Sequence, residues 1–319
     1  MYIHQNKLIE KINEVNIVIC VTFHYIENRL HFLEKILNEH PGFGKNVKVY
    51  IFTNTDNKYE INNIIKTIPD KNKSLYNGDY TYQIVSCINL EHPYNLILEH
   101  KKILINNFLN NKKFTHFLHT EDDVLILKEN ISYWLKFRKK LFFSGIFPSF
   151  FRYETNDKST LKSTDISFKI IKFLCPKIAI DNLIFYNMPN PSQSNYLIDH
   201  LLADDMIKYP NNRKKHFYFN FEGIRENADI GPIFSNVPKN YISRNFVPFV
   251  QNNNKLEILT SCLIEHLPAN YIDNKLSNLG KINIDDLFLK FPFFNMDLLR
   301  NIKYFPLVKF INFLIKVRK

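Results

Sequence analysis

Short apolar runs alternate with longer segments of helical period through the first 140 residues, and this alternation narrows the possible folds more than any other feature. The apolar runs, rich in β-branched and aromatic residues, predict strands over 15–22, 47–52, 82–87 and 115–120. The segments that follow them carry apolar residues at helical spacing, over 28–38, 61–68, 95–110 and from about 128. Strands that alternate with helices predict an α/β sheet whose parallel strands are covered by helices on both faces.

Beyond residue 145 the predicted strands become shorter and the loops more polar. Strands are expected at 147–152, 183–187, 195–198 and 217–221, with helices at 199–209 and near 222–230. No internal repeat or clear linker divides this region from the first. The chain therefore predicts one mixed-sheet domain over 1–275, made of halves at 1–140 and 141–275, followed by an extension over 276–319.

The composition restricts the partners of such a domain. The 319 residues carry 42 basic and 31 acidic side chains, which gives a net charge of +11. Such an excess favours an anionic partner: nucleic acid, an anionic membrane or a phosphorylated small molecule. The basic residues are scattered and form no recognisable nucleic-acid-binding motif, so nucleic acid is not expected as a partner.

Neither the N-terminus nor the cysteines indicate export. Charged residues interrupt the first 20 positions, and no run of 18 apolar residues occurs, so neither a signal peptide nor a transmembrane helix is expected. The four cysteines lie far apart, without the short spacing of zinc sites, at Cys20, Cys87, Cys175 and Cys262. These features favour a cytoplasmic protein with reduced thiols.

Three consecutive acids carry the strongest chemical signal in the sequence. Glu121, Asp122 and Asp123 follow the predicted strand 115–120 directly, and open α/β sheets bind their ligands at the carboxyl ends of strands. A divalent cation would relieve the repulsion between the acids, and Mg²⁺ or Mn²⁺ prefers oxygen ligands that also bridge to a diphosphate. The alternative is helix capping, which the later onset of the next helix, near Lys128, explains poorly.

With this motif the chain resembles the GT-A superfamily of nucleotide-sugar glycosyltransferases, whose nucleotide-binding half is an α/β sheet that ends in an Asp-x-Asp-type motif. Glu-Asp-Asp is a variant of that motif, and the resemblance covers roughly residues 15–270. It implies a GT-A-like, Rossmann-type mixed sheet, with the nucleotide sugar bound by the half at 1–140 and the acceptor by the half at 141–275. It makes Asp123 a metal ligand, and Glu121 and Asp122 contacts to the metal or to the sugar nucleotide.

The resemblance also assigns nucleotide-sugar contacts to the loops after the first two strands. Thr22, Phe23 and His24 follow the first strand, where an aromatic ring could stack on a base. Asn54 and Asp56 follow the second strand and would bond a uracil-like base or its ribose, which favours a UDP-sugar donor. Ordinary turn chemistry explains these residues equally well. Lys101 would pair with the diphosphate, or it lies on a solvated helix face.

Two further segments complete the site that the resemblance implies. In the stretch 221–232 the acids Glu222, Glu226 and Asp229 recur on one helical face. Glu226 is the first choice and Asp229 the second for the base that an inverting enzyme needs, with Arg225 as a clamp. The alternative is a surface helix with intrahelical ion pairs. His266 is the expected late histidine of the metal site, and an imidazole favours Mn²⁺ over Mg²⁺.

The extension over 276–319 ends in a basic amphipathic segment. After Pro306 the polar residues form a narrow stripe on an otherwise apolar helix; they are Lys309, Asn312, Lys316 and Lys319. Such a helix either lies on an anionic membrane surface or packs on the domain.

The expected protein is therefore a cytoplasmic or peripheral-membrane transferase with a glycan or lipid-linked acceptor, in surface polysaccharide assembly. A nucleotidyltransferase of similar fold and a non-catalytic glycan-binding module are the alternatives.

Overall fold

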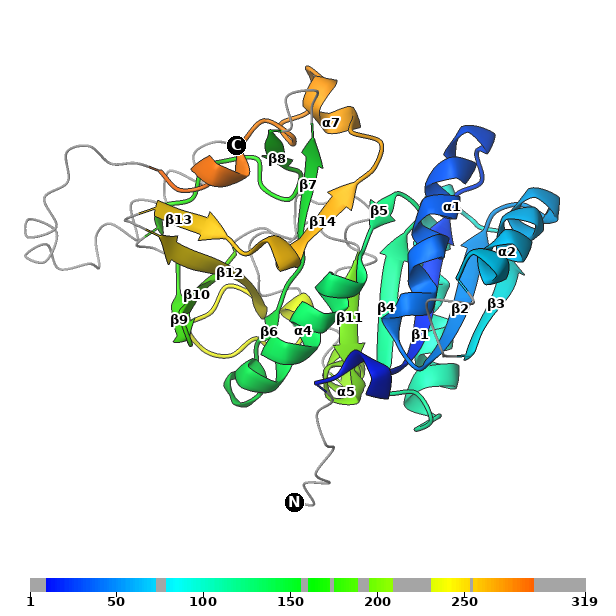
Figure 1. The fold of residues 1–319 in the computed structure, drawn as a ribbon, viewed down its shortest axis with the longest axis horizontal. Helices are drawn as coiled ribbons and strands as arrows, with labels where there is room; N and C mark the ends of the chain where they lie inside the picture. Colours follow the sequence, from blue (N-terminus) through cyan, green and yellow to red (C-terminus); the bar gives the residue numbers. More distant parts are fainter. Residues whose placement is uncertain are drawn as a thin grey trace, which may run out of the picture.

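The computed structural model describes residues 10–72, 79–155, 160–172, 175–188, 195–208, 231–252 and 255–289. Figure 1 shows two lobes side by side: one holds β1 to β4 together with β11, and the other holds β6 to β10 and β12 to β14. The predicted strand at 217–221, the predicted helix near 222–230 and the basic helix after Pro306 lie outside the described residues.

The first sheet has the strand order β11-β4-β1-β2-β3. The strands run over Asn16–Phe23 (β1), Asn46–Thr53 (β2), Asp79–Ser86 (β3), His116–Glu121 (β4) and Tyr196–Asp199 (β11). The first four are parallel, and β11 is antiparallel to β4. This confirms the predicted parallel strands of the first half, with bounds that differ by up to three residues.

Helices cover both faces of this sheet, as the sequence predicts. Residues 17–21 of β1 and all of β4 are buried, and successive side chains of a strand point to opposite faces. On one face Trp134 of α4 (Lys128–Leu141) meets His116 edge-on, with ring centroids 5.6 Å apart. On the other, Phe108 contacts the Phe117 ring at 5.8 Å. The remaining helices beside the sheet are α1 (Leu30–Glu39), α2 (Tyr59–Asn72) and α5 (His200–Lys208).

The helix predicted over 95–110 is broken into three pieces. A 3₁₀ helix over Pro93–Leu98 begins with proline, α3 spans His100–Ile103, and a π-helical segment covers Leu104–Leu109. The buried ring of His100 donates from Nδ1 to the carbonyl oxygen of Ile97, an acceptor that a continuous α-helix would use for its own ladder. The apolar spacing predicts the buried face correctly but not this interruption.

Two smaller sheets form the other lobe (Figure 1). One has the order β13-β12-β10-β9, with β6 paired to β12; the bounds are Phe147–Pro148 (β6), Lys177–Ile180 (β9), Leu183–Asn187 (β10), Asn245–Asn252 (β12) and Lys255–Ile258 (β13). The second has the order β5-β14-β7-β8; the bounds are Val124–Leu125 (β5), Phe151–Thr155 (β7), Leu161–Ser163 (β8) and Leu263–His266 (β14). The predicted α/β class with parallel and antiparallel pairing is confirmed.

The single strand predicted over 147–152 is wrong, because the chain passes there from one sheet to the other. β6 pairs with β12, whereas β7 pairs with β14. Pro148 has no N–H to donate, and the next residue, Ser149, donates its N–H to the carbonyl of Phe246 at 2.9 Å. The division between two sheets depends on partners about 100 residues away, which the local pattern does not encode.

The packed body continues past residue 275, where the sequence placed the end of the domain. After the short α7 (Asn270–Asp273), Gly280 donates its N–H to the carbonyl of Ser163 at 2.9 Å, and Leu289 donates to that of Ile170 at 2.9 Å. Ile284 and Leu287 are buried in the same core. Residues 276–289 therefore belong to the folded body rather than to a separate extension.

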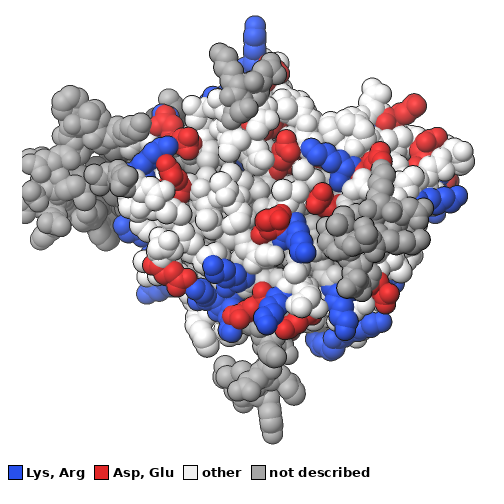
Figure 2. All heavy atoms as spheres, viewed as in Figure 1, with Lys and Arg blue, Asp and Glu red and all other residues white. Residues whose placement is uncertain are grey.

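The charge on the face in Figure 2 is mixed. Basic and acidic side chains are interspersed over this face rather than gathered into one basic patch.

The four cysteines are free thiols, three of them buried and Cys87 half-buried. In the described part of the chain, no helix has the length and apolar character that a membrane span requires.

Candidate functional site

The three acids of the motif lie at the carboxyl end of β4, beside the end of β1. The N–H of Asp122 donates to the carbonyl of Thr22 at 3.1 Å, which fixes the turn against the neighbouring strand. Glu121, Asp122 and Asp123 are each at most 4% exposed. Carboxylates so deeply buried need partners that compensate their charge.

Arg29 is the first of these partners, and the sequence analysis missed it. It lies in a 3₁₀ turn, Glu27–Arg29, after β1. Its Nε and Nη2 donate to the two carboxylate oxygens of Asp122, both at 2.8 Å, and Nη2 also reaches Asp123 Oδ2 at 2.7 Å. This two-pronged contact is the geometry that suits a guanidinium group. The signal in the sequence was an arginine just after the first strand, at the same sheet edge as the acids.

The pKa values of the two aspartates are shifted in opposite directions. Burial, with the negative charge of Asp123 beside it, raises the pKa of Asp122 to about 7 against the opposing effect of Arg29. Burial also acts to raise the pKa of Asp123, but His266, Arg29 and Arg152 outweigh it, so this pKa lies below its ordinary value. Asp123 therefore loses its proton more readily than Asp122.

His266 faces Asp123 because of how β14 pairs. The strand β5 follows the acids directly, and β14 lies antiparallel to it with His266 opposite Val124. The N–H of Leu267 donates to the carbonyl of Asp123 at 2.8 Å. His266 Nε2 then lies 3.5 Å from Asp123 Oδ2, so the structure brings together these two predicted metal ligands.

The other side of the His266 ring is held by a buried carboxylate. Its Nδ1 lies 2.6 Å from Oε1 of Glu154, which is completely buried on β7. The ring also stacks on Tyr271, with centroids 5.0 Å apart. Burial acts to lower the pKa of His266, but Asp123 and Glu154 outweigh it, so the pKa is raised.

Glu121 does not join Asp123 and His266. β4 ends at Glu121, and Asp123 lies in the turn that follows; Glu121 Oε2 lies 3.6 Å from Nη1 of Arg152. Arg152 Nε also donates to Asp165 Oδ1 at 3.2 Å. Among the described residues, no three His, Cys, Asp or Glu side chains are gathered as metal ligands. Of the predicted set of Asp123, Glu121 and His266, the structure brings Asp123 and His266 together and places Glu121 beside Arg152.

This pair nevertheless fits a divalent cation. Asp123 Oδ1 is buried and has no hydrogen-bond partner within the described residues. Neighbouring ligands held at about 2.1 Å in an octahedron are about 3.0 Å apart, close to the separation of 3.5 Å between Asp123 Oδ2 and His266 Nε2. Mg²⁺ and Mn²⁺ keep several waters or substrate oxygens, so two protein ligands suffice.

The nucleotide loops lie at the same edge of the sheet. Asn54 Oδ1 accepts from the N–H of Tyr25 at 2.6 Å, and Asn54 Nδ2 lies 3.3 Å from His24 Nε2, which ties the two loops together. Thr22 Oγ1 lies 3.0 Å from His119 Nε2. Phe23 is completely buried against Tyr25, so it packs in the core, and stacking on a base would fall to the half-buried Tyr25.

None of the contacts given above joins the remaining predicted site residues to Glu121, Asp122 or Asp123. Asp56 is exposed after β2, and Lys101 lies half-buried on α3. Glu222, Arg225, Glu226 and Asp229 lie outside the described residues. Asp205 on α5 pairs with the buried Arg244 at 2.9 Å.

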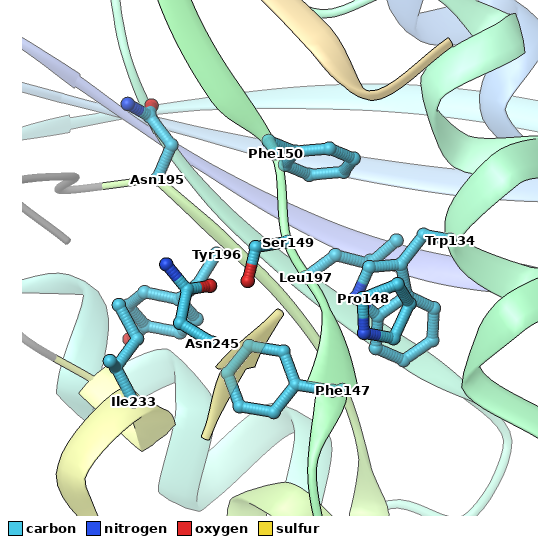
Figure 3. Close-up of a pocket in the computed structure, with 10 residues that line it drawn as sticks. All are labelled: Trp134, Phe147, Pro148, Ser149, Phe150, Asn195, Tyr196, Leu197, Ile233 and Asn245. Carbon is cyan, nitrogen blue, oxygen red and sulfur yellow. The ribbon is translucent and has the colours of Figure 1, made fainter. Parts of the chain in front are cut away.

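Figure 3 shows a small cavity whose lining includes Ser149 and Asn195. Its volume is about 10 Å³, close to the space that one water needs. Ser149 and Asn195 line it, and their Oγ and Nδ2 atoms have no hydrogen-bond partner among the described residues. Asn195 Oδ1 accepts from Thr120 Oγ1 at 2.8 Å and from the N–H of Glu121 at 3.1 Å. Asn195, just before the edge strand β11, therefore supports the start of the motif, and no pattern in the sequence predicted this role.

Replacing Asn195 with Ala should destabilise the protein by about 1–3 kcal/mol, because the buried N–H of Glu121 and the Thr120 hydroxyl lose their acceptor. Urea denaturation measures the change. The exposed Asn182, in the turn between β9 and β10, provides the control, and Asn182→Ala should change the free energy of unfolding by less than about 0.5 kcal/mol. Equal stability of the two variants would show that Asn195 does not support the motif.

A larger hollow, of about 480 Å³, lies between α4 and the strands β10 and β12. The residues that line it include Lys128, Lys136, Leu183 and Val250. None of the predicted site residues lines this hollow. The acidic motif remains the candidate site, because the ionised and buried groups gather there.

The sequence matches no family model and no curated protein. Among solved structures, S. aureus TarS 1–349 is similar at a TM-score of 0.34, with 11% identity over 72% of this chain and 57% of TarS. The same protein with UDP-GlcNAc gives 0.30, with 12% identity over 60% of this chain and 47% of that one. The mannosyltransferase PcManGT from Pyrobaculum calidifontis, with GDP-Man and Mn²⁺, gives 0.25, with 14% identity over 39% and 32%.

These likenesses are too weak to carry an argument about the site. The chain spans between 32% and 57% of the length of these structures.

Proposed function

We propose that the protein is a divalent-metal-dependent glycosyltransferase that moves a sugar from a nucleotide-sugar donor to a glycan or lipid-linked acceptor. The observation that carries the proposal is the ionised, buried Asp123 facing His266 at the carboxyl edge of a parallel sheet. Such edges bind nucleotides in open α/β folds. The Glu-Asp-Asp motif at the end of β4 is the feature that resembles the GT-A superfamily.

Asp123 and His266 would hold Mn²⁺ or Mg²⁺, and Asn54, His24 and Tyr25 would bind the base and ribose. A bound cation would supply charge stabilisation to the departing diphosphate. Arg29 is 30% exposed and touches both aspartates, so its guanidinium is within reach of the same phosphates. A UDP-sugar is favoured, with a hexosyl or N-acetylhexosaminyl group as the transferred sugar.

The acceptor side of the proposal rests on sequence alone. Glu226 would take the proton of the acceptor hydroxyl as that hydroxyl attacks the sugar, with Asp229 as the alternative base and Arg225 as a clamp. The basic segment after Pro306 would bring the enzyme to the cytoplasmic face of a membrane, where lipid-linked acceptors of a surface polysaccharide lie.

A thermal-shift panel of UDP-, GDP- and CMP-sugars, with and without Mn²⁺, tests the proposal. A donor at 100 times its Kd adds about 2.7 kcal/mol, which should raise Tm by on the order of 5 °C. The shift should need the metal and should be largest for a UDP-sugar. A panel in which no nucleotide sugar produces a metal-dependent shift would contradict the proposed function.

A further inference from the structure

Glu154 is a buried acid that the proposed reaction does not use directly. It lies on β7, is completely buried, and its carboxylate accepts hydrogen bonds from two backbone N–H groups of α7. The N–H of Tyr271 lies 3.1 Å from Oε2, and that of Ile272 lies 2.9 Å from it. Backbone N–H groups can only donate, so they favour Glu154 as an acceptor.

This arrangement determines the tautomer of His266. Oε1 of Glu154 lies 2.6 Å from His266 Nδ1, and an ionised carboxylate can only accept, so the proton of this bond is on Nδ1. In the neutral ring Nε2 then carries a lone pair. His266 Nε2 lies 3.5 Å from Asp123 Oδ2. The nitrogen lone pair and the carboxylate oxygen therefore face each other, and a cation placed between them would be attracted to both.

We propose that Glu154 is a positioning residue that holds His266 as the Nδ1–H tautomer, with Nε2 presented beside Asp123 as a ligand for a divalent cation. The inference rests on the proposed function and deepens it. Histidines that bind metals commonly donate their second ring N–H to a carboxylate, which fixes the ring and raises its basicity. The backbone of α7 holds Glu154 in place, because the N–H groups of Tyr271 and Ile272 donate to its carboxylate. The ring of Tyr271 stacks on His266 and supports the imidazole from one face.

The sheet explains why Glu154 and His266 meet although 112 residues separate them. β14 is parallel to β7, with Ile264 opposite Arg152, so continuing the register by two residues brings His266 level with Glu154. Residues two apart on a strand share a face, and Arg152 and Glu154 therefore lie on the same face. One face of β7 thus supports both Glu121, through Arg152, and His266, through Glu154.

The test compares Glu154→Gln with the wild-type protein by two measurements. Gln keeps the size of Glu but can donate to Nδ1, which would move the ring proton to Nε2 and block the ligand atom. Mn²⁺ affinity, followed by calorimetry, should fall by about 10- to 100-fold. In metal-free protein labelled with ¹⁵N-histidine, the His266 signal, assigned by its loss in His266→Ala, should change from the Nδ1–H to the Nε2–H form.

Glu257→Gln is the matched control, because Glu257 is a carboxylate on β13 that hydrogen-bonds Asn252. It should leave Mn²⁺ affinity and the His266 signal unchanged. Combining Glu154→Gln with His266→Ala should weaken Mn²⁺ binding no further than His266→Ala alone, since Glu154 acts through the ring. Additive losses, or an unchanged affinity in a folded Glu154→Gln variant, would overturn the role of Glu154.

Two outcomes separate this inference from the proposed function. A wild-type protein that binds no Mn²⁺ overturns both. A wild-type protein that binds Mn²⁺ and a nucleotide sugar, but carries the His266 proton on Nε2 in the metal-free state, overturns only the role of Glu154. This second measurement is made on the wild-type protein, so it does not depend on whether the Glu154→Gln variant folds.

Discussion

Replacing Asp123 with Asn should reduce metal-dependent sugar transfer by on the order of 1000-fold, because charge stabilisation by a bound cation contributes several kcal/mol and each 1.4 kcal/mol is a factor of ten. Asn keeps the size of the side chain but removes the ionised carboxylate beside His266. Arg29 keeps its two-pronged contact with Asp122, so the fold should survive. Mn²⁺ calorimetry and product formation from a UDP-sugar measure the two losses.

The control for Asp123→Asn is Asp285→Asn, which removes an exposed carboxylate 3.9 Å from Lys255. This variant should keep both Mn²⁺ affinity and turnover. Circular dichroism of both variants checks that the loss in Asp123→Asn is not caused by unfolding. If the Asp123→Asn variant folds and still transfers sugar at the wild-type rate with Mn²⁺, the acidic motif is not the metal site.

Replacing Arg138 with Met should destabilise the protein by about 3–5 kcal/mol, because it leaves Asp199 with a buried, uncompensated charge. Arg138 Nε donates to Asp199 Oδ2 at 2.8 Å, and both side chains are less than 10% exposed. Asp199 also accepts from the N–H of Leu202 at 2.9 Å and so caps α5. The pair joins α4, where Arg138 lies, to the end of β11, where Asp199 lies. Urea denaturation measures the free energy of unfolding.

Two further variants separate the buried charge from lost packing. Lys140→Met, two residues further along α4, breaks only the exposed pair with Asp181 and should cost at most about 1 kcal/mol. The double variant Arg138→Met with Asp199→Asn removes the stranded charge and keeps a cap, so it should be more stable than Arg138→Met alone. If Arg138→Met is no worse than Lys140→Met, the buried pair does not stabilise the protein.

Much of the first half could be predicted from local patterns. Strands β1, β2 and β4 are buried on both faces, and such strands appear in the sequence as continuous apolar runs. Asp123 could be selected because three acids directly follow such a run. The strands β12 and β14 were missed because β12 contains Pro248 and β14 has only four residues.

The supporting residues of the site could not be predicted in the same way. Glu154 and His266 meet through the pairing of β7 with β14, and Asn195 reaches Glu121 from an edge strand 74 residues later in the chain. The sequence offered one signal for these supporting residues: two charged side chains, Arg152 and Glu154, lie two positions apart within Phe151–Thr155. Alternation of this kind places both charges on one face but does not identify what lies opposite.

The antiparallel pairing of β5 with β14 also bears on the order of folding. Asp123 and His266 are 143 residues apart, so their contact closes a long loop and should form late. During synthesis every carboxylate of the Glu-Asp-Asp motif leaves the ribosome well before the strand that carries His266. A chain that stops before β14 would hold all the strands of the first sheet and still lack His266, one of the two ligands of the proposed metal site. The onset of activity would therefore report completion of the second lobe rather than of the sheet that carries the acids.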